Sequence, residues 1–533
     1  MSSEQTLWWQ SGVVYQIYPR SFMDSNGDGI GDLTGVTEKL DYLNWLGIDA
    51  IWLSPFYPSP LADFGYDVSD YVNVHPHYGD LAAFDQLVKE ANNRDIKIII
   101  DLVPNHTSDE HVWFQESRSS KTNPKRDWYV WRDPQPNGDP PNNWLSYFGG
   151  RAWEMDQETG QYYLHLFHKK QPDLNWRNPE VKQAMYDVMN FWLKRGVHGF
   201  RIDVIPALIK DEHLRDNPLN PDWKEGDPYS LQHFSHYSED QPEIHDITKE
   251  MRQITDQYPE RVLIGETYMP NPRLVKYYGE NLDGLHLPFN FGLLSFSELA
   301  AEKVKHMVDE YEAALPEGAW PNWVLGNHDT KRIASRIGVA RAKIAQMLLL
   351  TLRGTPTCYY GDELGMTNIT LSTELTRDPA AVGSPEHGRD PARTPMQWNS
   401  QPNAGFSPPN VTTWLPVAPN YQQQNVEVEQ QDPATLLNLV HTLIELRRTK
   451  AALNRGSYRS LDNVPTDCYV YLREFEGQKF LIALNFSAQE QQLILPELEK
   501  GHLLLSTEAK PTGTVDLAKL TLAGAEGVII ELG

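Results

Sequence analysis

Eight short apolar segments, separated by longer stretches with helical periodicity, constrain the fold of this chain more than any other feature. The segments are 13–19, 50–55, 97–103, 199–204, 261–267, 285–291, 322–329 and 356–363. Stretches such as 33–47 and 81–94 lie between them and carry apolar residues three and four positions apart. Strands that alternate with helices are typical of a parallel sheet, and eight such units close a barrel. We therefore predict an α/β fold built on a (β/α)₈ TIM barrel.

Two gaps between these segments are too long for simple crossovers, and the chain continues beyond the eighth segment. Residues 105–176 are rich in Pro, Gly, Asn and Trp, which predicts an inserted subdomain after the third strand. A second irregular stretch covers 366–432, before a predicted helix at 435–453. Four β-like runs in the tail predict an antiparallel β-sandwich. The expected domains are a barrel made of 1–104 and 177–455, an inserted B domain at 105–176 and a C-terminal domain at 456–533.

The composition excludes several classes of protein. The formal net charge of −25 opposes binding to nucleic acid or to an anionic membrane surface. Two cysteines do not form a disulfide framework, and no segment approaches the roughly 18 consecutive apolar residues of a membrane span. The N-terminal string MSSEQTLWWQ lacks the basic and apolar regions of a secretory signal. We expect a cytoplasmic protein, monomeric or homodimeric, without nucleic-acid or membrane partners.

Three of the apolar segments end in a carboxylate. The strings are GFRIDV at 199–204, LIGET at 263–267 and LGNHD at 325–329. A parallel barrel presents catalytic groups at the carboxyl ends of its strands, and glycoside hydrolysis needs two carboxyl groups in different protonation states. Alone, Asp203 fits a buried Arg–Asp pair, and Glu266 and Asp329 fit helix caps. Their occurrence together, with His106 at the equivalent position after the third segment, favours a catalytic site.

The neighbours of these carboxylates predict their protonation states. Arg201 lies two residues before Asp203, on the same face of a strand, where its charge would lower the pKa of Asp203 and keep it ionised. An ionised carboxylate is what a nucleophile requires. Gly265 allows another group to approach Glu266 closely. Apolar walls and nearby carboxylates would then favour the neutral form of Glu266, as a general acid requires.

A series of motifs along almost the whole chain resembles the α-amylase superfamily, glycoside hydrolase family 13. The motifs are YQIYPRSFMDSNGDGIGDL (15–33), WLSPFYPSPLADFGYDVSDY (52–71), DLVPNHTS (101–108), QPDLNW (171–176), GFRIDV, GET, GNHD, GTPTCYYGDELGM (354–366) and GRDPARTPMQW (388–398). The resemblance is to the α-glucosidase and oligo-1,6-glucosidase branch. It implies a glycoside hydrolase that acts on small α-gluco-oligosaccharides or α-glucosides.

The resemblance also implies a role for each carboxylate. Asp203 matches the nucleophile that forms a covalent glycosyl-enzyme, and Glu266 matches the general acid/base. Asp329 matches the third carboxylate, which holds the ring hydroxyls and stabilises the distorted transition state. Retention of the α configuration is implied, with the first two carboxyl groups about 5–5.5 Å apart. The residues that match those holding the sugar at subsite −1 are His106, Arg201 and His328.

A second set of matching residues implies an exo-acting enzyme. Asp63 and Arg389 match a pair that binds the non-reducing glucose and closes the pocket behind it, so that one terminal glucose leaves at a time. Tyr66 matches the aromatic platform under that ring. Phe148 and Phe167 are expected to form further walls.

The segment DSNGDGIGD (24–32) carries oxygen-bearing side chains at alternate positions, as calcium loops do. It is not an EF-hand, because Gly35 stands at the twelfth position in place of a bidentate Glu. On its own the segment fits a polar turn equally well. The same string in the resembled branch holds a structural Ca²⁺, which Mg²⁺ could replace, and no organic cofactor is expected. The implied ligands are Asp24, Asn26, Asp28, the carbonyl of Ile30, and Asp32.

The bond that is cut stays open at this stage. Val204, which follows the matched nucleophile, is typical of enzymes of this branch that act on α-1,6 bonds. Residues 205–223 nevertheless depart from oligo-1,6-glucosidase sequences, and a methyl-sized difference is worth only about 1–3 kcal/mol. Action on α-1,4 bonds and transglucosylation therefore both remain open.

Two other classes of function compete with an α-glucosidase. One is a sucrose- or trehalose-directed hydrolase or isomerase, although the RxDRx-type motif of sucrose isomerases is not found. The other is a non-catalytic protein like the heavy chains of amino-acid transporters, which carry a membrane anchor and have usually lost catalytic carboxylates. This chain has no such anchor segment and keeps all three carboxylates.

Overall fold

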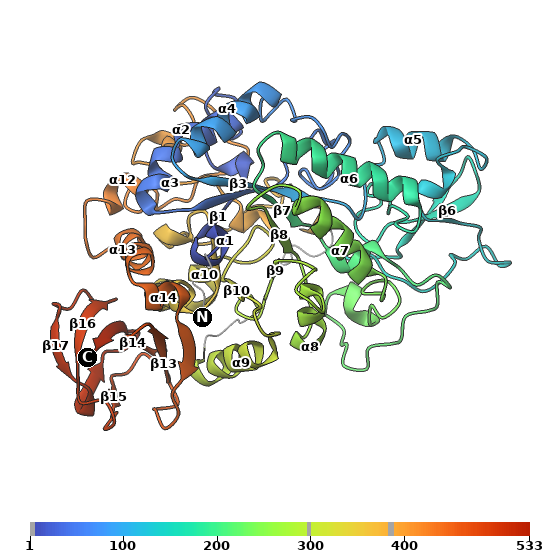
Figure 1. Ribbon diagram of the computed structural model, residues 1–533. Coiled ribbons are helices and arrows are strands. Elements are labelled where there is room, and N and C mark those ends of the chain that lie inside the picture. Colours follow the sequence, from blue (N-terminus) through green and yellow to red (C-terminus); the bar gives the residue numbers. More distant parts are fainter. Residues whose placement is uncertain (1–5, 296–299, 382–387) are drawn as a thin grey trace.

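The computed structural model describes residues 6–295, 300–381 and 388–533. These residues form an eight-stranded parallel sheet in the order β10-β11-β1-β2-β3-β7-β8-β9, which curls into a nearly closed barrel (Figure 1). The strands are β1 (Val14–Ile17), β2 (Ala50–Leu53), β3 (Lys97–Leu102), β7 (Gly199–Ile202), β8 (Val262–Gly265), β9 (Leu287–Pro288), β10 (Asn322–Val324) and β11 (Thr355–Tyr359). All eight predicted segments contain a strand, so the predicted (β/α)₈ fold class is confirmed.

The helices begin and end at residues whose chemistry favours a helix boundary. At the start of α6, Asn178 accepts a hydrogen bond from the Glu180 amide, and Pro179 occupies the first helical position. Helix α3 ends at Gly47, which adopts the left-handed conformation with φ 92°. The helices are α1 (Trp8–Ser11), α2 (Leu33–Glu38), α3 (Leu40–Leu46), α4 (Leu81–Asn92), α5 (Val112–Ser119), α6 (Pro179–Lys194), α7 (Ile244–Thr255), α8 (Asn271–Leu274), α9 (Ala301–Ala314), α10 (Ile333–Ile337), α11 (Val339–Thr351), α12 (Val426–Glu429), α13 (Leu436–Thr449) and α14 (Ala451–Arg455).

Two of the predicted helices are each divided in the structure. The helix expected within 33–47 consists of α2 and α3, which meet at Lys39. The helix expected at 435–453 divides at Lys450, whose extended backbone separates α13 from α14. No helix in the described part of the chain is long and apolar enough to cross a membrane.

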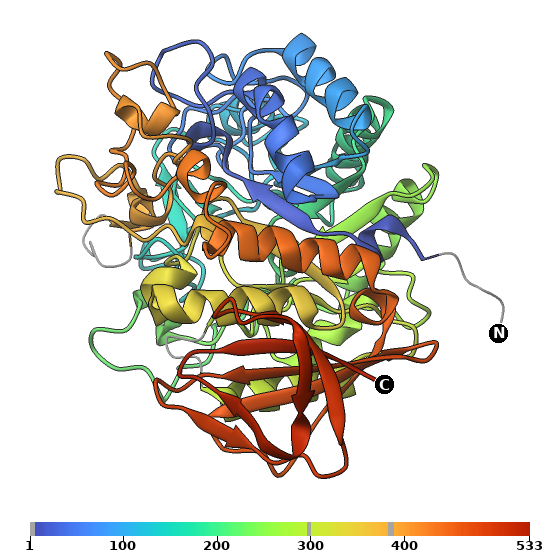
Figure 2. The same ribbon diagram turned by 90° about the vertical axis from the view of Figure 1, so that its left-hand side faces the viewer.

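Two further β regions flank the barrel. Between β3 and β7 in sequence, β4 (Trp131–Arg132), β6 (Gln161–Leu164) and β5 (Trp153–Asp156) form a three-stranded antiparallel sheet. After α14, a six-stranded antiparallel sheet and a two-stranded sheet enclose a separate apolar core (Figures 1 and 2). Their strands are β12 (Ser457–Ser460), β13 (Cys468–Phe475), β14 (Gln478–Asn485), β15 (Gln491–Leu493), β16 (Lys500–Ser506), β17 (Gly513–Asp516), β18 (Leu520–Leu522) and β19 (Gly527–Leu532).

The irregular insertion predicted at 366–432 is only partly described. Residues 379–381 and 390–392 form short 3-10 turns, and 382–387 lie outside the described residues. Residues 1–5, the start of the expected non-signal N-terminus, lie outside them as well. The insertion positions two arginines beside the carboxyl ends of the barrel strands, as described next.

Candidate active site

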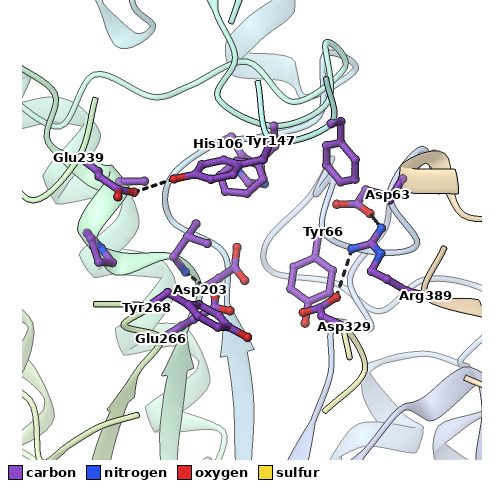
Figure 3. A pocket seen from close by; sticks show the side chains of 16 residues that line it. Asp63, Tyr66, His106, Tyr147, Asp203, Glu239, Glu266, Tyr268, Asp329 and Arg389 are labelled. Atoms are coloured by element: carbon purple, nitrogen blue, oxygen red, sulfur yellow. Dashed lines mark hydrogen bonds and ion pairs between the residues drawn. The ribbon is translucent and has the colours of Figure 1, made fainter. Parts of the chain in front are cut away.

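The carboxyl ends of several barrel strands meet at one pocket of about 340 Å³, within the usual range for small-molecule sites (Figure 3). Asp203 and Glu266 each directly follow their strands, β7 and β8, which pair with Ile202 opposite Gly265. The two carboxylates are therefore side by side. Asp329 and His106, which follow β10 and β3, complete the polar lining of this part.

One arginine connects three carboxylates beneath the pocket. Arg201 Nη1 donates to Asp203 Oδ1 at 2.6 Å and to Asp101 Oδ1 at 2.7 Å, and its Nη2 lies 2.9 Å from Glu266 Oε2. Burial raises the pKa of Asp203 well above its usual value, against the lowering effect of the Arg201 charge, and the charges of Glu266 and Asp101 add to the rise. Burial likewise raises the pKa of Asp101 to about 6. The predicted Arg201–Asp203 pair is present, but its net effect differs from the prediction because one cation serves three anions.

The residue after Asp203 has a strained backbone. Val204 adopts the left-handed conformation with φ 34° and ψ 45°, which is unfavourable for a β-branched residue. This conformation directs the Val204 amide to Glu266 Oε2 at 2.8 Å. Gly265 leaves room for Leu285, because a Cβ at this position would lie 2.2 Å from a methyl carbon of that side chain. The backbone on both strands thus fixes the position of Glu266.

The end of the pocket around Asp63 and Arg389, which we call the closed end, is held by buried ion pairs. Arg389 Nη2 lies 2.7 Å from Asp63 Oδ1 and 2.6 Å from Asp378 Oδ1, and its Nη1 lies 3.2 Å from Asp329 Oδ1. Arg393 Nη2 approaches the same Asp329 oxygen at 3.0 Å. Asp63 is only 4% exposed. The predicted Asp63–Arg389 pair is therefore part of a larger charged network.

Asp329 and Asp378, two carboxylates of the closed end, are ionised at neutral pH, whereas burial raises the pKa of Asp63. Burial raises the pKa of Asp329, but His328 and the guanidinium groups of Arg389 and Arg393 outweigh it and hold the pKa below its usual value. At Asp378 the same balance, with hydrogen bonds from Arg389, lowers the pKa to about 2. Two arginines thus keep Asp329 and Asp378 in the form that only accepts hydrogen bonds.

Aromatic and histidine side chains form the walls near the closed end. The Tyr66 ring is stacked on that of His328, with centroids 5.3 Å apart, and its hydroxyl lies 2.7 Å from His328 Nε2. Phe167 packs against His106, and the Arg389 guanidinium lies 5.3 Å from the Phe148 ring. Burial lowers the pKa of both histidines to about 3, so both rings are neutral at physiological pH.

The opposite side of the pocket, which we call the open end, is formed by Tyr147, Glu239 and Tyr268 (Figure 3). Tyr147 is 44% exposed and Tyr268 is 56% exposed. The Tyr147 hydroxyl donates to Glu239 Oε2 at 2.9 Å. The Tyr268 ring stacks on Phe291 with centroids 4.0 Å apart. The pocket is therefore bounded by buried ion pairs at one end and by exposed side chains at the other.

The chain matches the family model described as "Alpha amylase, catalytic domain" over residues 16–456. It belongs to the alpha-amylase family. Maltase 1 of Drosophila virilis is 40% identical over 98% of this chain and 87% of that protein. Oligo-1,6-glucosidase of Heyndrickxia coagulans is also 40% identical, over 96% of this chain and 98% of its own length. Family membership identifies the chain as a glycoside hydrolase.

Solved structures with the same fold come from two kinds of enzyme. The alpha-glucosyl transfer enzyme XgtA has a TM-score of 0.94 at 41% identity and covers 99% of this chain and 100% of its own. The trehalulose synthase MutB from Pseudomonas mesoacidophila MX-45 has a TM-score of 0.91 at 36% identity, with the same coverage. Membership in the alpha-amylase family is therefore compatible with hydrolysis, transfer and isomerisation.

In this family member, the structure brings most of the predicted site residues to the pocket surface. The predicted residues that line the pocket are Asp63, Tyr66, His106, Phe148, Phe167, Asp203, Glu266, Asp329 and Arg389. Arg201 and His328 instead contact the lining side chains from behind. Arg201 and His328 would therefore affect a ligand in the pocket mainly through their contacts with the lining side chains.

Several site residues were missed by the sequence prediction. Asp101 and Arg393 lie inside quoted motifs, DLVPNHTS and GRDPARTPMQW, so their charge at a strand end or beside Arg389 was an available signal. Asp378, Tyr147 and Glu239 lie in irregular segments without a recognisable spacing. Only the folded structure brings Tyr147 and Glu239 to the pocket lining and Asp378 to Arg389.

The predicted metal loop is compact in the structure. Asp24 Oδ1 accepts from the Gly27 amide at 2.7 Å, and Asp32 Oδ1 accepts from Ser25 Oγ at 2.7 Å. Its side-chain and carbonyl oxygens are of the type that Ca²⁺ and Mg²⁺ prefer. Within the described residues no group of three or more His, Cys, Asp or Glu side chains is placed to hold an ion. The metal ligands, Asp24, Asn26, Asp28, Ile30 and Asp32, stay a prediction.

Proposed function

We propose that this protein is a retaining exo-α-glucosidase that releases the terminal non-reducing α-glucose from short oligosaccharides. Relatives named maltase and oligo-1,6-glucosidase support glucosidase activity. The observation that carries the proposal is the pairing of β7 with β8, which brings Asp203 and Glu266 side by side on a pocket whose far end is closed. Adjacent carboxylates suit a double displacement, whereas inverting enzymes separate them to admit a water.

The proposed reaction uses each carboxylate in turn. Asp203 attacks the anomeric carbon while Glu266 gives its proton to the leaving oxygen, which forms a glucosyl ester on Asp203. Glu266 then removes a proton from water, which attacks the same carbon and releases Asp203. The ionised Asp329 accepts hydrogen bonds from the ring hydroxyls, and Arg201 binds the two reacting carboxylates throughout.

Exo action is supported by the closed end. Arg389, bound by Asp63, Asp378 and Asp329, fills the space beyond the first sugar. Separating these buried charges to admit a longer chain would cost several kcal/mol. A single glucose unit therefore fits between the closed end and the reacting carboxylates.

The test is a set of initial rates on maltose, isomaltose, sucrose, trehalose and p-nitrophenyl α-glucoside. We expect glucose as the first product, released as the α-anomer in NMR spectra taken during the first turnovers. Release of β-glucose would contradict the retaining mechanism, and release of maltose from longer chains would contradict exo action. The ratio of kcat/KM on isomaltose and maltose decides between α-1,6 and α-1,4 bonds, and Val204 favours the former.

A sucrose-directed isomerase or a glucosyl transferase is the second candidate. The likeness to the trehalulose synthase and to the alpha-glucosyl transfer enzyme favours it. It predicts that sucrose is converted to another disaccharide with little free glucose. Hydrolysis of sucrose to glucose and fructose, or no reaction with sucrose, would exclude the isomerase.

We also propose a structural Ca²⁺ at the loop formed by residues 24–32. Asp24, Asn26, Asp28, the Ile30 carbonyl and Asp32 would hold it, and Mg²⁺ could occupy the same site. The oxygen-rich side chains at alternate positions support this assignment. Asp24 also accepts a hydrogen bond from Ser407 at 2.7 Å, so an ion here would stabilise the contact between the two segments.

A further inference from the structure

Because the closed end blocks one side of the pocket, the second sugar of a substrate must lie on the other side. With one glucose between Arg389 and the reacting carboxylates, the leaving group extends toward the open end. There Glu239 and Tyr147 face the pocket from two different loops (Figure 3). Tyr147 belongs to the segment inserted after β3, and Glu239 to the segment between β7 and α7.

Glu239 is held in place by two neutral hydroxyl groups. Its Oε2 accepts from the Tyr147 hydroxyl at 2.9 Å, and its Oε1 accepts from the Ser235 hydroxyl. Among the described residues Glu239 forms no ion pair, whereas its neighbour Asp240 is paired with Arg273 at 2.6 Å. Asp240 also accepts from the Tyr277 hydroxyl at 2.6 Å. Asp240 thus anchors the loop to the barrel. Glu239 can still accept hydrogen bonds from a further partner.

The hydrogen-bonding positions of Glu239 that remain free of these two partners can only accept hydrogen bonds. A carboxylate offers about four acceptor positions, of which two are used at Glu239. The Tyr147 hydroxyl already donates its proton to Glu239, so its oxygen can only accept a further hydrogen bond. Such a surface binds groups that donate hydrogen bonds, and sugar hydroxyls are donors of this kind. The adjacent Tyr147 ring, stacked on Phe167 with centroids 5.1 Å apart, gives a fixed apolar face beside it.

We propose that Glu239, positioned by Tyr147 and Ser235, binds the hydroxyl groups of the second sugar and so selects a sugar as the leaving group or acceptor. This inference rests on the proposed α-glucosidase function. It assigns recognition of the second sugar to a residue of the open end, separate from Asp63, Arg389 and Asp329, which contact the first. Water carries no sugar hydroxyls, so the same contact favours transfer to a sugar over hydrolysis.

The test compares substrates that share the glucose unit and differ only in the leaving group. In Glu239→Gln, one acceptor oxygen becomes an amide donor of the same size. We expect kcat/KM on the better of maltose and isomaltose to fall about tenfold or more, the usual effect of losing hydrogen bonds to a charged group. On p-nitrophenyl α-glucoside, whose leaving group has a nitro group in place of hydroxyls, the change should stay within about twofold.

Two further variants separate recognition from loop stability. Asp240→Asn weakens the neighbouring anchor without touching the pocket, so it should lower the melting temperature and leave the ratio of kcat/KM on the two substrates unchanged. Tyr147→Phe removes the hydroxyl that orients Glu239 and should shift the ratio in the same direction as Glu239→Gln, by a smaller factor. Equal losses on both substrates in Glu239→Gln, or no loss on either, would overturn the inference.

A second measurement follows the glucosyl-enzyme directly. p-Nitrophenyl α-glucoside loads Asp203 with glucose, and added maltose competes with water for it. In transfer, the C1–Asp203 bond breaks, the bond from C1 to the maltose oxygen forms, and the maltose proton goes to Glu266. We expect Glu239→Gln to lower the ratio of transfer product to free glucose severalfold, and an unchanged ratio would contradict the inference. A wild-type enzyme that cleaves no α-glucoside would instead contradict the proposed function itself.

Discussion

The closed and open ends of the pocket bind a sugar by opposite means. At the closed end, Arg389 is paired with three carboxylates, and the adjoining Tyr66 is 6% exposed. At the open end, the hydrogen-bond partners of Glu239 among the described residues are two hydroxyl groups, and Tyr147 is 44% exposed. Buried charges are costly to separate, so the closed end has one arrangement, whereas exposed hydroxyl contacts can be exchanged for those of a ligand. Under the proposed function, the first sugar would meet a rigid site and the second an adaptable one.

The largest expected effect comes from removing the group that serves both ends. Asp203→Asn keeps the size of the side chain and removes the attacking charge. We expect kcat to fall on the order of 10⁴-fold or more on every substrate, as is typical for loss of a nucleophile. Circular dichroism and thermal melting should show an intact fold. A variant with near-native kcat would contradict the assignment of Asp203.

The second effect is restricted to the closed end. Arg389→Ala leaves three carboxylates without their shared cation, a loss of roughly 3–5 kcal/mol for a buried pair. We expect kcat/KM to fall about 10²–10³-fold, equally on maltose and on p-nitrophenyl α-glucoside, because both carry the same first sugar. Arg215→Ala is the matched control, since it removes an exposed arginine from its pair with Asp211, outside the pocket lining, and should change kcat/KM by less than about twofold. Unequal losses on the two substrates would show that the two ends are not independent.

The third effect is a pH dependence that distinguishes the reacting carboxylates from the closed end. Asp203 must be ionised to attack, and burial raises its pKa and that of the coupled Asp101, the latter to about 6. We expect kcat/KM on p-nitrophenyl α-glucoside to decline with falling pH along an acid limb well above the usual aspartate pKa of 3.8, approaching tenfold per unit. The inhibition constant of glucose, which depends on the ionised closed end, should change less. An acid limb found only below about pH 4 would contradict this prediction.

Thermal melting at several pH values serves as the control for that profile. The pKa of Asp378 is lowered to about 2, so its ion pair with Arg389 stabilises the fold fully above its unfolded value near 3.8. That contribution is lost only as the pH falls from about 4 toward 2. Asp101 has the opposite sign, because its raised pKa lets the folded chain bind a proton before the unfolded one does. A melting temperature that collapses between pH 7 and 5 would therefore point to unfolding as the cause of lost activity.

The same contrast explains how much the sequence could predict. Asp203, Glu266 and Asp329 stand in short motifs at or just after strand ends, where barrel geometry brings them together. Asp63 and Arg389 lie in loops and were identified by their match to family motifs. Glu239 and Tyr147 stand in loops whose paths depend on tertiary contacts, so no spacing in the sequence predicts their hydrogen bond. The raised pKa of Asp203 was also missed, because it depends first on burial and then on nearby charges that include Asp101 on the neighbouring strand β3. A local sequence pattern can identify an ion pair such as Arg201–Asp203. The net effect of all surrounding charges and of burial on a pKa requires the three-dimensional structure.

The smallest expected effect lies outside both ends. Removing the proposed Ca²⁺ with EDTA should lower the melting temperature by about 2–5 °C, from the loss of ligand-linked stability. The ratio of activities on maltose and p-nitrophenyl α-glucoside should not change, because the loop at 24–32 contributes no residue to the pocket lining. Asp28→Asn should remove the response of the melting temperature to added Ca²⁺. A wild-type melting temperature that is unchanged after prolonged dialysis against EDTA would argue against the metal site.

The pairing of β1 with β11 has a consequence for folding of the chain during its synthesis on the ribosome. Val14 lies opposite Thr357, so the first strand waits for a partner that is translated more than three hundred residues later. At about 5–20 residues per second, that interval lasts roughly 20 to 70 seconds. During this time the edge of β1 that will meet β11 is unpaired, and such edges promote association between chains. The yield of active enzyme should therefore depend on how well the growing chain is shielded, for example by chaperones or by low temperature during expression.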